Sequence, residues 1–445
     1  MRKLTTATLA AAGACLVLLT SVCGSALAAA EKRPQAAVAE EVEEIIVEDE
    51  AWDGGYVGVE PGCRVLEPCG GLPQGLLWCE ADYLLWWTKG MEIPPLVTSG
   101  TTGALGAPGT RILYGDETIF DNARSGFRVG LGSWFDCGRG YGLEGDYWML
   151  GETTDHFRAA SDSAGSPALF RPFFNVNPRG ADGGFDPPAR EDAEIVSSPG
   201  VLAGAIDVDS FTQLHGAGLR FRRQLCCATS CSDGCDPCCQ PVETSSRLDL
   251  LVGYRYVQLR EGIAIREDLT SLLSAPEQGS FDIVDQFGTS NRFHGADLGV
   301  TWRAQCGPWL VDILGKLALG GVRQTVLIDG QTVISGSLND NGTYAGGLLA
   351  QRTNIGQHRR NVFAMIPELG VNLGYQLTPC LSAKIGYNFL YWSRVVRPGD
   401  EIDLDVNPDL LPPETEFAGA PRPSFEWRDT DYWAQGIRVG LEGVW

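Results

Sequence analysis

The sequence predicts an all-β protein, an antiparallel transmembrane β-barrel of about 10 strands, with about 12 as the alternative. Three observations favour this fold. Apolar and polar side chains alternate along several runs, each near the roughly 9 to 11 residues that a tilted strand needs to cross a membrane. Short and long connections follow one another in turn, and the chain ends on an alternating run closed by Trp445. Short periplasmic turns and long extracellular loops are typical of outer-membrane barrels.

The start of the chain has the pattern of an export signal. Arg2 and Lys3 are followed by an apolar run from Ala7 to Leu19 and by a small-residue cleavage site ending at Ala28. We therefore expect residues 1–28 to be a cleaved signal peptide; a lipoprotein site at Cys23 is the alternative. No later run of about 18 apolar residues predicts a transmembrane helix. The expected location is the outer membrane of a Gram-negative-type bacterium.

Residues 29–76 form a separate segment before the predicted barrel, which occupies 77–445. The stretch "EEVEEIIVEDE" from Glu40 to Glu50 carries seven carboxylates. Such a charge run is usually solvated and without fixed structure. We expect an acidic, disordered periplasmic segment, with a contact tail or a plug as the alternative.

The last strand illustrates the repeating pattern. Its alternate positions hold apolar residues on one face and glycine or charge on the other. An outer-membrane barrel turns the apolar face to lipid and the polar face to the lumen. A soluble sandwich would bury the apolar face instead, so a single strand does not separate the two folds. Similar runs are predicted near residues 77–87, 125–134, 141–150, 211–224, 247–260, 292–303, 309–319, 362–375, 381–394 and 433–445.

Loop lengths favour the membrane barrel. Connections 135–140, 304–308 and 376–380 are short, and long loops alternate with them along the chain. The exception is 225–246, which is long although it occupies the place of a short turn. A soluble sandwich has no reason to place its long loops at one end. Two features complicate the strand count. Asp329 and Gly330, within Val322–Ser335, have the composition of a hairpin turn that would raise the count to 12, and Pro367 would remove a ladder hydrogen bond from its strand.

The polar faces define the expected lumen. Barrels of about eight strands are filled by side chains and those of about 16 to 18 hold a water channel, so about ten predicts a small or gated pore. The mixed charges could line such a pore or pair across it and block it. The expected lumen-facing residues are Glu80, Asp82, Arg128, Glu144, Asp146, Arg220, Arg222, Asp249, Arg255, Asp312, Lys316, Glu368, Lys384, Arg438 and Glu442.

Twelve cysteines follow the signal, and all fall on the expected periplasmic rim or before the first strand. The cluster "CCATSCSDGCDPCC" has thiol spacings that could hold zinc. Disulfides persist in an oxidising periplasm, and no histidine lies nearby, so we expect disulfides of unassigned pairing. The candidates are Cys226, Cys227, Cys231, Cys235, Cys238 and Cys239.

Several function classes are excluded or disfavoured. The net charge of −22 argues against a nucleic-acid partner. The four histidines, His156, His215, His294 and His358, belong to no catalytic motif, so we expect neither an enzyme nor a cofactor. An acidic loop has spacings that resemble a calcium loop, but Pro408 replaces its glycine. A solvated loop is the default interpretation; the alternative metal ligands are Asp403, Asp405, Asn407, Asp409 and Glu414.

Longer motifs resemble a known family. "ADYLLWWTKGMEIPPLVT", "FHGADLGVTWR", "PWLVDILGKLALG" and "IPELGVNLGYQLTPCLSAKIGYNFLYWSRVVRPGDEID" are similar to the beta-barrel porin-7 family of planctomycete outer-membrane proteins, from about residue 78 to the end. The resemblance implies an outer-membrane barrel and therefore an outer-membrane lipid environment. Together with the width expected from the strand count, it leads us to expect a narrow or gated porin-like channel for ions or small solutes. A structural barrel with a plugged lumen and functional surface loops is the alternative. In such barrels the last strand looks like the signal read by the barrel insertion machinery, here Ile437, Val439, Leu441 and Trp445.

Overall fold

The computed structural model describes residues 76–135, 138–179, 188–232, 242–274, 277–336, 340–414, 416–417 and 419–445. The expected signal peptide, and the acidic segment up to residue 75, lie outside these residues. In the part of the chain that is described, no helix has the length and apolar character needed to span a membrane.

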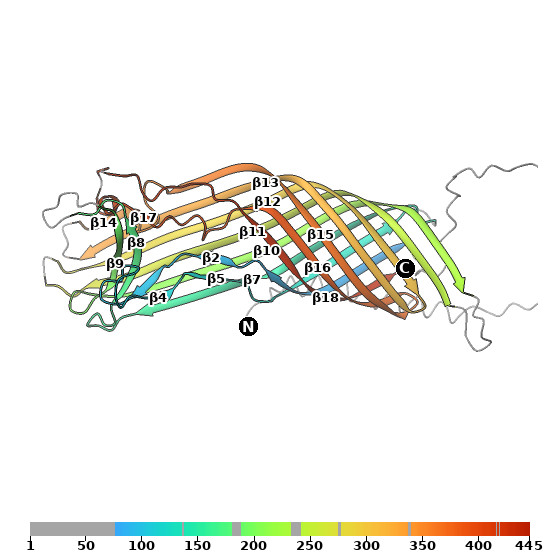
Figure 1. Ribbon diagram of the computed structural model, residues 1–445, viewed down its shortest axis with the longest axis horizontal. Coiled ribbons are helices and arrows are strands. Elements are labelled where there is room, and N and C mark those ends of the chain that lie inside the picture. Colours follow the sequence, from blue (N-terminus) through green and yellow to red (C-terminus); the bar gives the residue numbers. More distant parts are fainter. Residues whose placement is uncertain are drawn as a thin grey trace, which may run out of the picture.

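Ten antiparallel strands form a closed ring, as the sequence predicts (Figure 1). Neighbours in the chain are neighbours in the ring, and β1 pairs with β18 to join the two ends. The strands are β1 (Leu77–Thr88), β6 (Arg124–Trp134), β7 (Tyr141–Ala160), β10 (Leu202–Ser232), β11 (Val242–Ser271), β12 (Gly279–Cys306), β13 (Trp309–Gly336), β15 (Gly356–Thr378), β16 (Leu381–Val395) and β18 (Thr430–Val444).

Four strands continue far beyond a membrane crossing. β10 to β13 contain 31, 30, 28 and 28 residues, against the roughly 9 to 11 that a crossing requires. The expected ranges 211–224, 247–260, 292–303 and 309–319 were therefore too short, chiefly at the end that carries the long loops. In Figure 1 these strands run the length of the molecule.

The two faces of these strands exchange polarity along their length. Near the short turns, Phe221 is 65% exposed on the outside while its neighbour Arg220 is buried inside. Farther along the same strand, Val208 is buried inside and Asp209 lies on the outside, where it binds Arg266. The first half has the pattern of a lipid-facing barrel, and the second has the pattern of a sheet in water.

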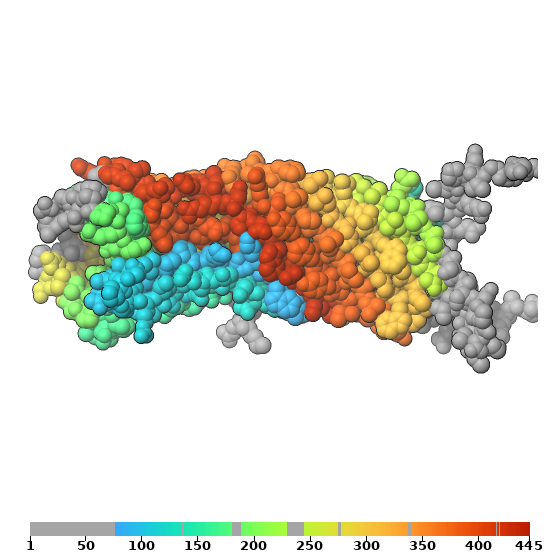
Figure 2. Space-filling view, in the orientation of Figure 1, coloured from blue at the N-terminus to red at the C-terminus, as the bar shows by residue number. Residues whose placement is uncertain are grey.

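The second half of the barrel is an open sheet closed by loops. The β6–β7 ladder ends at Gly126 opposite Leu150, and the β15–β16 ladder ends at Glu368 opposite Leu390. Beyond these points the segments 89–123 and 396–429 cover the opening, as the blue and red surfaces in Figure 2 show. Tyr114 stacks on Phe157 of β7, and Arg360 of β15 lies over Trp427. Aromatic contacts therefore attach each covering segment to a sheet edge.

Short strands form a cap at this end. β8 (Leu169–Asn175) is the centre of a small sheet with β3 (Val97–Ser99), β9 (Arg190–Ser197) and β17 (Asp405–Val406), and β4 (Arg111–Tyr114) pairs with β3. The remaining elements are β2 (Met91–Ile93), β5 (Glu117–Ile119), β14 (Gly342–Ala345) and the 3-10 helix η1 (Pro408–Leu410). A continuous apolar cluster joins the cap to the upper wall of the barrel.

The predicted hairpin at Asp329 and Gly330 is wrong. Both residues lie within β13, where Asp329 faces Gln286 and Gly330 faces Asp285 of β12. The ladder on β12 holds the strand straight, so the alternative of 12 strands is excluded. Pro367 occupies the position before Glu368, where β15 parts from β16. The proline thus lies at a sheet edge, which tolerates its missing N–H.

Candidate functional site in the barrel interior

Arg220 on β10 is the centre of a buried ion-pair network. Its Nε atom lies 2.5 Å from Asp297 Oδ2, and its Nη1 atom donates to Asp146. Arg255 approaches the same Asp297 at 3.5 Å and also binds Glu368. Arg220 is 1% exposed and Asp297 is 0% exposed, so water does not reach this centre. The β-strand period places these side chains inward from five different strands.

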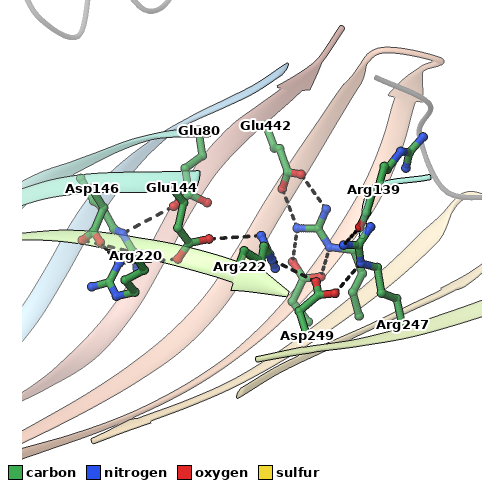
Figure 3. Close-up of polar contacts among 12 residues, drawn as sticks. Glu80, Arg139, Glu144, Asp146, Arg220, Arg222, Arg247, Asp249 and Glu442 are labelled. Atoms are coloured by element: carbon green, nitrogen blue, oxygen red, sulfur yellow. Dashed lines mark hydrogen bonds and ion pairs between the residues drawn. The ribbon is translucent and has the colours of Figure 1, made fainter. Parts of the chain in front are cut away.

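A second part of the network lies toward the short turns. Arg303 binds Asp312 and Glu442, each at 2.7 Å. Lys384 contacts the same two carboxylates. Figure 3 shows neighbouring members pointing toward one another, including Arg222, which bridges Glu144 and Asp249.

The network is electrically balanced. Its ion pairs involve nine basic and nine acidic side chains, so most charges have an opposite neighbour. All fifteen expected lumen-facing residues belong to it. The lumen-facing residues predicted from strand alternation did not include Arg247, Asp297 and Arg303. Each continues the inward alternation of its strand, for example Asp297 between the outward Ala296 and Leu298, so the same signal would have found them.

Little space remains among these charges. A cavity of about 70 Å³ lies between them, lined by Glu80, Arg128, Asp146, Lys316 and Arg438 among others. A buried water needs roughly 10–15 Å³ of such space, so the cavity holds only a few waters.

An apolar layer fills the barrel above the charges. Leu214, Val257 and Phe293 are 0% exposed, and the Trp392 side chain packs edge-on against Phe293 at 6.2 Å. Together with Leu84, Leu150 and Ile366 they form one cluster of inward residues. Alternation alone does not predict this layer, because apolar positions of a membrane barrel are expected on the lipid face.

Arg171 links the cap to the wall by buried ion pairs. Arg171 of β8 lies 2.5 Å from Glu267 Oε1 and 2.7 Å from Asp285 Oδ2. Asp285 also accepts the backbone N–H groups of Leu348, Leu349 and Ala350. Arg171 is 1% exposed. Glu194, opposite Arg171 on β9, has its pKa raised to about 8 by burial and then by the Glu267 charge.

The expected calcium-like loop holds its carboxylates apart. Asp403 accepts hydrogen bonds from Arg422 and Ser424, and Asp409 accepts one from Asn177. Asn407 caps the helix η1. Within the described ranges, no three histidine, cysteine or acidic side chains are arranged to hold a metal. The structure therefore does not bring Asp403, Asp405, Asn407, Asp409 and Glu414 together as a metal site, and the loop is packed rather than freely solvated.

An acidic groove of about 990 Å³ runs along the seam between the two covering segments. One bank carries Glu92 and Asp116, and the other carries Asp400 and Asp429. Most of its charged side chains are acidic, in keeping with the charge of the whole chain.

The cysteine prediction is corrected at one position. Cys226 has a free, exposed thiol, as does Cys306. Cys227 is disulfide-bonded, as are Cys79 and Cys380. The side chains of Cys231, Cys235, Cys238 and Cys239 lie outside the described residues. At the neighbouring chain end, Trp445 exchanges two backbone hydrogen bonds with Leu77.

The four histidines lie on strands of the barrel, and one of them, His358 of β15, contacts a covering segment. His215 and His294 contact Tyr256 on the outside of the barrel, His156 lies 2.8 Å from Asp209, and His358 stacks on Phe425.

Three solved structures share features of this shape. They are the outer membrane protease OmpT from Escherichia coli (10% identity, 84% of this chain and 98% of that chain, TM-score 0.38), a FadL homologue from Pseudomonas aeruginosa (8%, 83% and 90%, 0.21), and the TodX deltaS2S3 mutant monoaromatic hydrocarbon channel (8%, 84% and 93%, 0.19). These likenesses are too distant to inform activity. No curated protein matches the sequence.

A family model, by contrast, covers the whole barrel. The model described as Putative beta barrel porin-7 (BBP7) matches residues 78–445, which include every strand of the ring except the first residue of β1. The closed ring of ten strands and its apolar outer band agree with that description. The chain therefore belongs to this family of outer-membrane β-barrel porins.

Proposed function

We propose that this protein is an outer-membrane barrel whose lumen is closed at rest, and that its working part is the extracellular half-barrel with its covering segments. The apolar layer carries the proposal. A diffusion pore needs a continuous water path, yet Leu214, Val257 and Phe293 in this layer are 0% exposed. Beneath it, a balanced ion-pair network fills the lumen instead of lining it.

The size of the extracellular half supports this assignment. About half of β10 to β13 extends past the lipid-facing band, which is more than loop attachment requires. The cap, the covering segments and the acidic groove all lie on this half. Surface loops held on a rigid scaffold commonly carry binding functions.

Planar-bilayer conductance tests the proposal. We expect folded wild-type protein to be silent, and the double variant Phe293→Ala with Trp392→Ala to give reproducible small steps, because it removes two aromatic rings that pack against each other in the apolar layer. Trp302→Ala is the matched control, since Trp302 is 38% exposed on the outer wall. Heat-modifiable gel migration confirms that each variant is folded. Reproducible steps from wild-type protein would sink the closed-lumen proposal.

A gated channel for ions or small solutes is the second candidate, and the Arg171 contacts favour it. Arg171 is a buried ion-pair link between the cap and Glu267 and Asp285 of the wall, so breaking this link would loosen the cap. Arg171→Met should then produce openings that the wild type lacks. If the Arg171→Met barrel folds but stays silent, the gated-channel candidate is wrong and the structural barrel with a closed lumen remains.

We further propose the cellular setting. The protein would be exported by a cleaved signal, meet the insertion machinery through β18, and remain non-enzymatic and without a cofactor or a nucleic-acid partner. Ile437 and Val439 are 38% and 50% exposed on the outer face of β18, which leaves them available for recognition. Trp445→Ala should lower the amount of assembled barrel in the outer membrane. Disulfides at the periplasmic rim would make assembly sensitive to reductant.

A further inference from the structure

Four exposed arginines form a band on the outer wall, from adjacent strands β11, β12, β13 and β15. Arg292 lies directly opposite Arg323 in the β12–β13 ladder. Arg260 faces Ser290, two positions from Arg292, and Arg359 faces Thr325, two positions from Arg323. Each arginine is thus a direct or diagonal neighbour of the next. We call these four residues the arginine band.

The band has no acidic partners among the described residues. None of its four arginines appears in an ion pair; Arg260 lies over the Phe211 ring at 5.6 Å, and Arg359 donates to Gln357. Two arginines farther out on the wall are paired: Arg158 binds Asp207, and Arg266 binds Asp209. Like charges placed directly opposite in a sheet repel each other. In a chain of net charge −22, four uncompensated positive charges indicate that the partner is an anion from outside the chain.

The position of the band identifies the source of that anion. The ring of His294 contacts Tyr256, which contacts His215, which contacts Tyr147. Such aromatic girdles mark the level of the lipid head groups. Arg292 lies two residues outward from His294 on the same face, and Arg260 lies four residues outward from Tyr256. At about 3.3 Å per residue, the band is roughly 7–13 Å beyond the girdle.

We propose that the arginine band binds the phosphate groups of anionic lipids in the outer leaflet. A guanidinium group matches phosphate in a bidentate geometry, and it keeps its charge at any physiological pH. One phosphate between Arg292 and Arg323 would replace their repulsion with two charge-assisted contacts. The lipid bound there would contact the base of the extracellular half-barrel along β11, β12, β13 and β15.

Native mass spectrometry of the full chain in neutral detergent tests the proposal. The probe is bis-phosphorylated lipid A, compared with its dephosphorylated form. We expect wild type to retain the phosphorylated form, and Arg292→Gln with Arg323→Gln to bind it about tenfold more weakly, since two charge-assisted contacts are lost. Arg158→Gln with Arg266→Gln removes the same charge from paired positions farther out, and it should bind like wild type.

Two further readouts separate the alternatives. Without lipid, Arg323→Gln should raise the urea midpoint of unfolding because the repulsion is gone; added phosphorylated lipid should stabilise wild type more than this variant. If the double variant does not fold, each single variant carries the same comparison. Equal retention of phosphorylated and dephosphorylated lipid, or equal loss in the control variant, would overturn the proposal. Full displacement of the lipid by an equal concentration of inorganic phosphate would overturn the assignment to lipid.

Discussion

Arg220 Nε lies 2.5 Å from Asp297 Oδ2 in the interior of the barrel, and neither residue is reached by water. The two residues come from β10 and β12, which are separated in the ring by β11. The ion pair therefore spans the inner face of β11. It ties together strands that share no backbone hydrogen bond.

Asp297→Asn should strongly destabilise the barrel. The substitution leaves Arg220 and Arg255 facing a neutral side chain, and removing one partner of a buried pair costs about 3–5 kcal/mol. The measurement is the urea midpoint of unfolding in lipid vesicles. Asp282→Asn, an exposed position of the same strand, should stay within about 0.5 kcal/mol of wild type. Equal midpoints for the two variants would show that the network does not stabilise the fold.

Alternation alone predicted much of the lower barrel. The fifteen expected lumen residues all belong to the ion-pair network, because a strand fixes which face a side chain occupies. The number of strands and the closed antiparallel ring were also predictable, since loop lengths mark the two ends.

The upper barrel was not predictable in the same way. Alternation reports that two faces differ, but not which medium covers each face. Along β10, the inward side chain is charged at Arg220 and apolar at Val208. If lipid covered the whole outer wall, every apolar position would face outward; on that expectation the predicted strands end at the membrane edge and the apolar interior layer is not predicted. Asp329 and Gly330 were wrongly predicted to form a hairpin turn for a related reason. Their local turn propensity is outweighed by the β12–β13 ladder, which pairs both residues.

Gly440→Ala should also destabilise the barrel. A Cβ at this position would lie 2.0 Å from Asp82 Oδ1 and 2.4 Å from the backbone oxygen of Ala81. Because a backbone atom is involved, side-chain rotation cannot relieve the clash; overpacking costs about 1–3 kcal/mol. Gly321→Ala is the control, since its Cβ would meet nothing within 4 Å. Unfolding midpoints compare the two. A Gly440→Ala barrel as stable as Gly321→Ala would mean that the strand shifts freely.

Thiol labelling should report the orientation of the barrel. Cys226 and Cys306 lie at the end with the short turns and are free and exposed, and short turns face the periplasm. A membrane-impermeant maleimide should therefore miss both on intact cells and label both after the outer membrane is permeabilised. Cys226→Ser and Cys306→Ser identify the two adducts by mass. Ser335→Cys, at the opposite end of β13, should be labelled on intact cells. Labelling of Cys306 with protection of Ser335→Cys would invert the topology.

The stability of the cap should fall as pH rises. Glu194 has its pKa raised from 4.5 to about 8 by burial and then by Glu267; Arg171 opposes this shift and Asp285 adds to it. A raised carboxyl pKa means that the folded state holds the proton more tightly than the unfolded state. The resulting stabilisation is complete below about pH 4.5 and is lost progressively up to about pH 8, where the second buried charge forms near Glu267.

Glu194→Gln mimics the protonated carboxyl and should remove this dependence. We expect its protease resistance across β8 and β9 to match wild type at pH 5 and to exceed it at pH 9, because the amide cannot ionise. Resistance is read as the urea concentration at which the cap becomes cleavable, corrected for protease activity at each pH. Glu277→Gln, an exposed position outside the cap, should follow wild type at both values. If Glu194→Gln also follows wild type at pH 9, ionisation of Glu194 does not control the cap, and the pH response must come from another group.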